Sequence, residues 1–528
     1  MMDKKKQKQI LRVLRSTFIA GALTAYSLPG AMAAVSNNML PQDGHFIHGN
    51  GSIVKPNENV MNIVQNGQNA VIKWGDFSIG SMSTVNFDKT NGGIFNVLNY
   101  IDSGKISQIY GTINAKNGNV FIANTAGTIV GKSASINVGS LYVSNKKMSD
   151  ENLNAFYNGG NNPTIQGQLT NAQIMNLGHI EANKISFEGD RIVLDIDKVK
   201  GNNSISTDIN IHSQNADNVV IGYTAYDKAN KTYANKDKNF NITKIDENGN
   251  EIEKQSVKGY MWIDNVEQLQ NMNTNLSGNY ALHSNIDALN TSASIGDTFT
   301  AIGDENKAFT GKLDGLMWQD ADIPYGIFDL NVTGKDKNSN NVGLFGVTDG
   351  ASIKNLLLSG GSSTGENNIG SIVGLAKNTT VENVISSSNV TGKENVGGIV
   401  GNAINNTNGG TYSGLVNTGN IKGETNVGGI IGSITGGKII NSQNVGRIEG
   451  LGNDSHNIGG IVGLAKEKNY LQGVQNSLTI IGGYNVGGIV GSGENITIDQ
   501  AENNGNVTAT GYTQEEYYYH NAGGGKMD

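Results

Sequence analysis

"NVGGIVG", residues 395–401, is the most informative stretch of the sequence, because close variants of it return five more times in the second half of the chain. Successive copies begin 27, 27, 31, 31 and 28 residues apart. A repeat of this length is too short for a propeller blade of about 40 residues and cannot bury its apolar face alone. The stretch therefore predicts a stack of short units. The copies begin at Asn341, Asn368, Asn395, Asn426, Asn457 and Asn485.

Short alternating runs fill the space between the copies, for example "TTVENVISSSNVTG" (379–392) and "GKIINSQNVGRIEG" (437–450). These runs are β-branched and end in Gly or Asn turns. They predict an all-β fold, an elongated right-handed parallel β-helix (β-solenoid), with coils roughly 4.8 Å apart. Val and Ile of each copy should point inward, glycines should lie at tight corners, and the repeated Asn should form a ladder of stacked amides. A flexible Gly-rich linker, the alternative, would lack the repeated apolar positions.

Composition narrows the class of protein further. The 528 residues include 72 Gly, 5 Pro and no Cys, and 37% are hydrophobic, which is too many for general disorder. A net charge of -8 argues against nucleic acid as a partner. Without cysteine, stability cannot come from disulfides. One hypothesis for this absence is that the chain crosses a second barrier unfolded, which a disulfide would prevent.

The first 34 residues have the order of a secretory signal peptide. Basic residues lie between Lys4 and Arg15, an apolar run extends from Phe18 to Leu28, and Ala31-Met32-Ala33 supplies an A-x-A cleavage site. A membrane anchor would need about 20 apolar residues, which this run does not reach.

Residues 35–255 also consist of strands and turns. Within them, 225–254 are charged and turn-rich, which indicates an exposed hairpin or loop. Helical periodicity appears only in "DNVEQLQNMNTNLSG" (264–278).

Four stretches carry a family resemblance: "MLPQDGHFIHGNGSI" (39–53), "NGQNAVIKWGDFSIGSMSTVNF" (66–87), "FNVLNYI" (95–101) and "SQIYGTINAKNGNVFIANTAGTIVGKSASINVGSLYVS" (107–144). Their order and spacing resemble the secretion domain of two-partner secretion exoproteins of the filamentous-haemagglutinin type. That family usually carries Asn-Pro-Asn-Gly where this chain has residues 124–127, and its Asn-Pro-Asn-Leu motif is not visible here. The repeats from Asn341 resemble the GLUG motif of bacterial surface adhesins. The matching secretion-domain residues are Asn66, Gly67, Trp74, Phe77, Ile79, Gly80, Asn86, Phe87, Asn124 and Gly127.

The resemblance implies a Gram-negative, adhesin-like exoprotein, secreted through the periplasm to the medium or the cell surface. Its domains would be a signal peptide (1–34), a secretion domain (35–255), a β-rich connection (256–340) and GLUG-type repeats (341–528), the last incomplete. Its partners would be an outer-membrane β-barrel transporter with periplasmic recognition domains, and a glycan or protein receptor on a host or neighbouring cell. The alternatives are the stem of a contact-dependent toxin without its effector domain, or a polysaccharide-active β-helix enzyme.

Motifs for catalysis or cofactor binding do not emerge from the sequence. "ANTAGTIVGKS" (123–133) resembles a phosphate-binding loop but has three residues, not four, between Gly127 and Gly131. We interpret it as a strand, a corner made by Asn124 and Gly127, and a second strand. His45 and His48 lack a third metal ligand nearby, and "DENGNEIE" from Asp246 lacks the Gly and Glu that a calcium loop requires. We therefore predict no enzyme activity, no cofactor and no metal.

Overall fold

A computed structural model describes residues 35–201, 208–234, 237–291, 299–316, 325–334, 339–406 and 410–511. The predicted signal peptide, residues 1–34, lies outside them. The fold is nearly all β and its sheets are mostly parallel, which confirms the predicted all-β parallel β-helix. The chain forms two compact units, which are described separately: an N-terminal unit of residues 31–224 and 236–260, and a C-terminal unit of residues 225–235 and 261–528. Handedness and elongation stay predictions.

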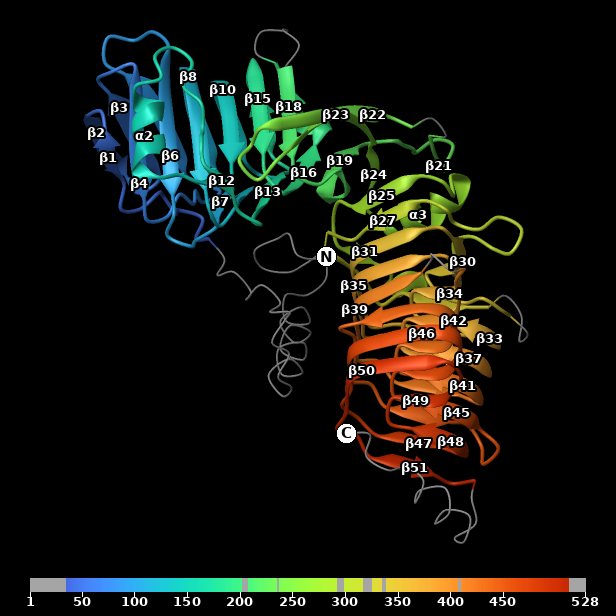
Figure 1. Ribbon diagram of the computed structural model, residues 1–528. Coiled ribbons are helices and arrows are strands. Elements are labelled where there is room, and N and C mark those ends of the chain that lie inside the picture. The colour runs from blue at the N-terminus through green and yellow to red at the C-terminus, as the bar shows by residue number, and fades with distance from the viewer. Residues whose placement is uncertain are drawn as a thin grey trace. The chain divides into compact units, whose positions relative to one another are not determined.

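The N-terminal unit is built around a sheet in the order β1-β4-β6-β8-β10-β15-β18-β22-β23, blue to green in Figure 1. From β4 to β22 neighbouring strands are parallel, while β1 and β23 are antiparallel ends. The strands are β1 (His45–His48), β2 (Gly51–Asn57), β3 (Val60–Gln65), β4 (Asn69–Trp74), β5 (Thr84–Lys89), β6 (Phe95–Ile101), β7 (Ser107–Ile109), β8 (Thr112–Asn124), β9 (Thr128–Val130), β10 (Ser135–Ser144), β11 (Lys146–Lys147), β12 (Gln168–Leu169), β13 (Gln173–Asn176), β14 (His179–Glu181), β15 (Lys184–Glu188), β16 (Arg191–Asp195), β17 (Val199–Lys200), β18 (Asp208–Ser213), β19 (Val219–Tyr223), β22 (Asn239–Ile245) and β23 (Glu251–Lys258).

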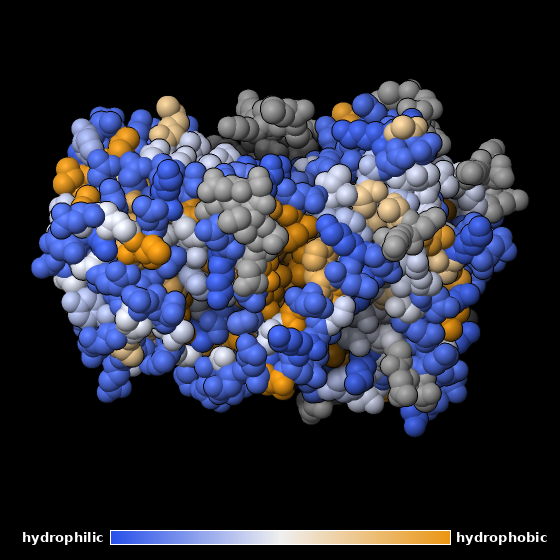
Figure 2. Space-filling model, turned by 90° about the horizontal axis from the view of Figure 1, so that it is seen from above, coloured by the Kyte–Doolittle hydropathy of each residue, from blue (hydrophilic) through white to orange (hydrophobic). Residues whose placement is uncertain are grey.

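The core of this unit is a continuous column of apolar side chains inside the coils. Met61, Val85, Ile113, Ile136 and Ile180 lie in register on successive strands and are all at most 1% exposed. Each side chain therefore shelters the one on the next coil, as the hydrophobic effect requires. The face seen in Figure 2 is mostly hydrophilic, with apolar residues gathered in smaller patches.

One helix was missed by the sequence prediction. The helix α2 (Asp150–Tyr157) begins with a capping box between Ser149 and Asn152 and buries Leu153 and Phe156. The usual capping-box residue at the third position is Glu or Gln, and here it is Asn, so the signal was weak. The predicted helix within 264–278 is confirmed as α3 (Val266–Gln270), which a 3-10 turn continues from Asn271 to Thr274.

The segment 225–254 forms two hairpins, and the prediction that it is exposed was wrong for several residues. The hairpin of β20 (Tyr226–Asp227) and β21 (Thr232–Tyr233) buries Tyr233. The hairpin of β22 and β23 buries Ile242 and Ile245, while the first four residues of β23 are exposed. Aromatic and branched residues lie among the charged ones in this segment. They are buried because removing apolar surface from water stabilises the folded state.

The C-terminal unit stacks coils that each carry up to four strand positions, seen from yellow to red in Figure 1. The second and third positions form one long run of parallel pairs, and the first and fourth form sheets of five and seven strands. The strands are β24 (Tyr260–Ile263), β25 (Asn279–Leu282), β26 (Ile286–Asp287), β27 (Lys312–Asp314), β28 (Gly326–Phe328), β29 (Asn331–Thr333), β30 (Phe345–Asp349), β31 (Ser352–Ser359), β32 (Ser362–Thr364), β33 (Asn367–Ile369), β34 (Val373–Lys377), β35 (Thr380–Ser386), β36 (Asn389–Thr391), β37 (Glu394–Gly397), β38 (Val400–Ile404), β39 (Thr411–Asn417), β40 (Ile421–Gly423), β41 (Thr425–Gly428), β42 (Ile431–Ile440), β43 (Gln443–Asn444), β44 (Ile448–Gly450), β45 (His456–Gly459), β46 (Val462–Asn476), β47 (Ile480–Gly482), β48 (Tyr484–Gly487), β49 (Val490–Gly493), β50 (Ile496–Asn503) and β51 (Val507–Ala509).

Inward side chains repeat from coil to coil as the sequence predicted. The column Ile353, Val381, Tyr412, Ile439 and Leu471 is fully buried and in register. The glycines of the repeat permit close approach of neighbouring backbones. At Gly398 an added Cβ would overlap the carbonyl oxygen of Gly429 on the next coil.

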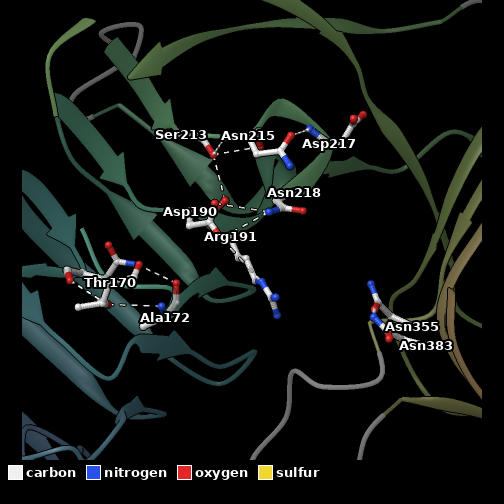
Figure 3. Close-up of polar contacts among 11 residues, drawn as sticks. Thr170, Ala172, Asp190, Arg191, Ser213, Asn215, Asp217, Asn218, Asn355 and Asn383 are labelled. Atoms are coloured by element: carbon white, nitrogen blue, oxygen red, sulfur yellow. Dashed lines mark hydrogen bonds and ion pairs between the residues drawn. The ribbon is translucent and has the colours of Figure 1, made fainter. Parts of the chain in front are cut away.

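A left-handed residue bends the third strand of each coil at the same place. Asn355 and Asn383 occupy this position with φ near +52° and +53°, and their amides are hydrogen bonded to each other at 3.3 Å (Figure 3). Asn355 also donates to the buried Asp314 carboxylate of the preceding coil. Asn and Gly tolerate this backbone region better than other residues, so they recur at the bend.

Candidate recognition surface

The bulky secretion-domain residues identified from the sequence build the core. Trp74, Phe77, Ile79 and Phe87 are each at most 5% exposed. The indole nitrogen of Trp74 donates to Asn99 Oδ1 at 3.0 Å. Because these side chains are buried, a partner cannot touch them while the domain is folded, and their effect on recognition would have to be indirect.

Three further residues of this set shape turns. Asn124 donates to the carbonyl of Lys105 and to Ser107 Oγ, and its Oδ1 accepts from the backbone N–H of Ala126. Gly127 has φ near +107°, and a Cβ there would lie 2.6 Å from the carbonyl oxygen of Gln173. At Gly80 a Cβ would overlap the carbonyl oxygen of Ser36. The loop that resembles a phosphate site is thus a corner between β8 and β9.

Asn66 and Gly67 lie at an exposed corner before β4. Asn66 Nδ2 donates to Asn50 Oδ1 at 2.9 Å, and Thr90 Oγ1 donates to Asn66 Oδ1 at 2.8 Å. Beneath them the buried Gln65 amide donates to three carbonyl oxygens, including that of Gly67. The corner is therefore rigid and polar, and its surface atoms are available for contact.

Asn86 belongs to a second polar feature that sequence reasoning did not find. It lies on β5 between Asn62 of β3 and Asn114 of β8, and each Nδ2 donates to the preceding Oδ1 at 2.9 Å. Asn137 of β10 continues the row in register and is exposed. We call these four outward side chains the asparagine face.

The polar character of the asparagine face extends to its neighbours. Thr84, Thr112 and Ser135 form a parallel row on one side, and the exposed Asp88 and Lys116 lie on the other. Strand β2 pairs with β3 at the edge of this sheet, and six of its seven residues are exposed. Pro56 and Lys55 occupy the second half of β2, as on many protected edges. Residues 51–54 are therefore the part of β2 best suited to accept another strand.

The other outer face of the unit is covered. The side chains of α2 pack on Val71, Leu98 and Phe121, which form a separate apolar cluster. An amide ladder from Asn119 through Asn96 ends at Asn69, whose Nδ2 donates to the carbonyls of Tyr157 and Gly160 after the helix.

After α2, the chain returns to the sheet. The backbone carbonyls of Thr170 and Ala172 there accept hydrogen bonds from Asn145 Nδ2 at 3.0 and 2.7 Å, which fixes this segment (Figure 3). One face of the unit is thus closed by its own chain, and the asparagine face is open.

Several charged and titratable groups lie near these surfaces. Lys73 and Asp102 pair at 2.9 Å, and this hydrogen bond raises the pKa of the Lys73 ammonium. Burial raises the pKa of the Tyr100 hydroxyl on the covered face. The Asp246 carboxylate accepts from the backbone N–H groups of Asn248 and Asn250 and from the Asn250 side chain, which lowers its pKa, so it closes the β22–β23 turn.

The six repeat asparagines lie in a single ladder in the C-terminal unit, with φ between +50° and +59°. Each Nδ2 donates to the Oδ1 of the Asn one coil earlier, at 2.8 to 3.0 Å. At the first coil, Asn341 Nδ2 donates to the Glu305 carboxylate at 2.9 Å. The ladder fixes the register between coils.

Across the described ranges, no three His, Asp or Glu side chains gather in a way that could hold a metal ion. His45 Nδ1 is near the Asp43 carbonyl oxygen, and His48 stacks on Tyr157. None of the helices in the described part of the chain has the length and apolar character needed to span a membrane.

Comparison with known proteins identifies the family. Residues 38–307, slightly more than half of the chain, match the model of the TPS secretion domain. The chain belongs to this family. It is a two-partner secretion exoprotein, exported through the periplasm to the extracellular space or the cell surface. The family is a secretion domain and not an enzyme family.

Two curated relatives are heme/hemopexin-binding proteins of Haemophilus influenzae. One is 33% identical over 126 residues, which is 24% of this chain and 13% of the relative. The other, from strain KW20 / Rd, is 33% identical over 180 residues, which is 34% of this chain and 19% of the relative. The chain thus matches less than a fifth of the length of either relative. The HMW1 secretion domain of Haemophilus influenzae is similar at 13% identity over 88% of this chain and 100% of that domain, with a TM-score of 0.27, which is too low to support an argument.

Proposed function

We propose that an outer-membrane β-barrel transporter recognises the N-terminal unit. The transporter would bind this unit at the asparagine face and at residues 51–54 of β2. The observation that carries the proposal is the asymmetry of the unit: its apolar outer face is covered by α2, while the polar face beside a free strand edge is not. Periplasmic recognition domains could add a strand to β2, where main-chain hydrogen bonds give affinity and neighbouring side chains give specificity.

A secretion assay tests this contact. The chain is produced in a Gram-negative host together with its transporter, and the fractions in periplasm and medium are measured. Asn137→Lys places a charge on the exposed end of the asparagine face and should retain the chain in the periplasm. Ser256→Lys, on the exposed strand β23 of the same unit, is the matched control and should leave secretion unchanged. Equal secretion of both variants would argue against this face.

We further propose that the exported chain acts as an adhesin, and that the C-terminal unit carries the contacts to a glycan or protein receptor on a host or neighbouring cell. Support comes from its repeated outward side chains, for example Thr364 and Thr391, which lie in register on the seven-stranded sheet and offer similar weak contacts. Binding of purified protein to cells, with and without enzymatic removal of surface glycans, tests this role. If the purified protein bound to none of the cell types tested, the adhesin role would be refuted.

The domain plan remains part of this proposal: a signal peptide at 1–34, a secretion domain at 35–255, a connection at 256–340 and GLUG-type repeats at 341–528. The family match to residue 307 suggests a longer secretion domain than the sequence indicated. Heme/hemopexin binding is named for relatives that share at most 19% of their length with this chain, so it does not extend to this proposal. The alternative is the stem of a contact-dependent toxin, and inhibition of neighbouring cells by cells that produce this protein would favour it.

A further inference from the structure

The hairpin β20–β21 holds the beginning of the C-terminal stack. Although residues 225–235 lie in sequence between two parts of the N-terminal unit, they belong to the C-terminal one. Tyr233 is 2% exposed, and its hydroxyl donates to the carbonyl of Trp262 on β24 at 3.1 Å. Within the C-terminal unit, strand β24 is the first of the parallel strands that continue through β25, β27 and β31. The hairpin is therefore docked at the first parallel strand of this unit.

Backbone and side-chain hydrogen bonds fix the hairpin on both sides of Tyr233. The N–H of Tyr233 donates to Thr274 Oγ1 at 2.9 Å, and Asn275 Nδ2 donates to the carbonyl of Ala234 at 2.7 Å. Tyr226 donates to Glu267 Oε1 at 2.8 Å. Burial and the Glu267 carboxylate raise the pKa of Tyr226 to about 12, so this donor keeps its proton at physiological pH.

An aromatic row leads from the hairpin into the stack. Tyr233 meets Tyr280 edge to face at 4.9 Å, Tyr280 faces Phe309 at 6.3 Å, and Phe309 contacts Phe345 at 4.6 Å. Phe345 lies on β30, within the first copy of the repeat. Such aromatic pairs add to the free energy of burial, so the hairpin is coupled by packing to the first repeat.

We propose that the β20–β21 hairpin is a folding clip: the first coil of the C-terminal unit becomes stable only when the clip docks, and the later coils then add to it one by one. In a stack with nearest-neighbour contacts, each coil is stabilised by the coils beside it, and within this unit the first coil has such a neighbour on one side only. The clip supplies further contacts to that coil from a segment that precedes the stack in the chain. This inference does not depend on the transporter, since it concerns the folding of the chain itself.

Refolding of the full-length purified chain tests the clip. After dilution from denaturant, the gain of protease resistance by residues 339–511 is followed in time by mass spectrometry, with fragments of residues 38–201 as an internal reference. Tyr233→Ala should slow the gain of protease resistance by residues 339–511 at least tenfold and leave the rate for the reference fragments unchanged. Tyr412→Ala, a fully buried tyrosine in the middle of the stack, is the matched control. It should speed unfolding and change the refolding rate little, because its contacts form late.

The outcomes separate a clip from an ordinary core residue. Similar effects of both variants on the refolding rate would overturn the proposal, as would a Tyr233 effect confined to unfolding. If Tyr233→Ala does not fold, Asn275→Ala takes its place in the same assay with the same expected order. This substitution removes the bond to the Ala234 carbonyl and the bond accepted from Ser277 Oγ.

Discussion

The amide ladder of the repeats makes a quantitative prediction for Asn426, its fourth member. Asn426 is 6% exposed, donates to Asn395 at 2.9 Å and accepts from Asn457 at 2.8 Å. Asn426→Ala removes both bonds, each with a net contribution of about 1 kcal/mol. It also places Ala at φ +54°, which costs about 1 kcal/mol more than Asn. The expected loss in local stability is therefore about 3 kcal/mol.

Native-state hydrogen exchange measures this loss where it occurs, which matters because a repeat array need not unfold in two states. Amides of β37, β41 and β45 should exchange about 100-fold faster in the variant, since about 1.4 kcal/mol corresponds to a factor of ten. Asn91→Ala is the control, because Asn91 has φ +71° in an exposed turn and tests the backbone cost alone, about 1 kcal/mol. Equal losses for the two variants would refute the ladder as a source of stability.

Three further predictions follow from the packing. Ile399→Asp buries a charge and Gly398→Asp crowds the next coil, so both should make the surrounding coils sensitive to protease. Ile404→Asp, at a side chain that is 41% exposed, is the control and should not do so. Unchanged protease resistance in the first two variants would contradict the β-helix. Burial raises the pKa of Asp314 to about 6, above its usual value near 3.9, so the folded state binds the extra proton. This contribution is present below pH 4 and is lost as pH rises through 6, and Asp314→Asn should flatten that part of a pH series of urea unfolding. Asn69→Ala should release the segment after α2, seen as faster hydrogen exchange at residues 157–160 with β15 unchanged.

The fold was predictable where the sequence repeats visibly. The asparagines from 341 to 485 recur with the same apolar neighbours, and parallel stacking is the simplest way to bury those neighbours. The asparagine face was not predictable in this way. Its members Asn62, Asn86, Asn114 and Asn137 have different neighbours, and only the register of the strands shows that they form one row.

Local signals also failed where tertiary packing decides. The helix α2 has only two buried side chains, so its periodicity is weak, and its stability depends on the apolar sheet face beneath it. The charged hairpin around Lys231 was predicted to be exposed. Tyr233 is nevertheless buried, because it packs against residues that follow later in the chain. In both cases the deciding partner is distant in sequence.

Hydrogen exchange of β2 in the presence of the transporter's periplasmic domains is a direct measurement of recognition through the asparagine face and its strand edge. The amides of residues 51–54 that do not bond to β3 should become protected when the domains are added, and those of β23 should not change. Protection of β23 alone, or none at either strand while the domains bind, would contradict recognition through the asparagine face and its edge.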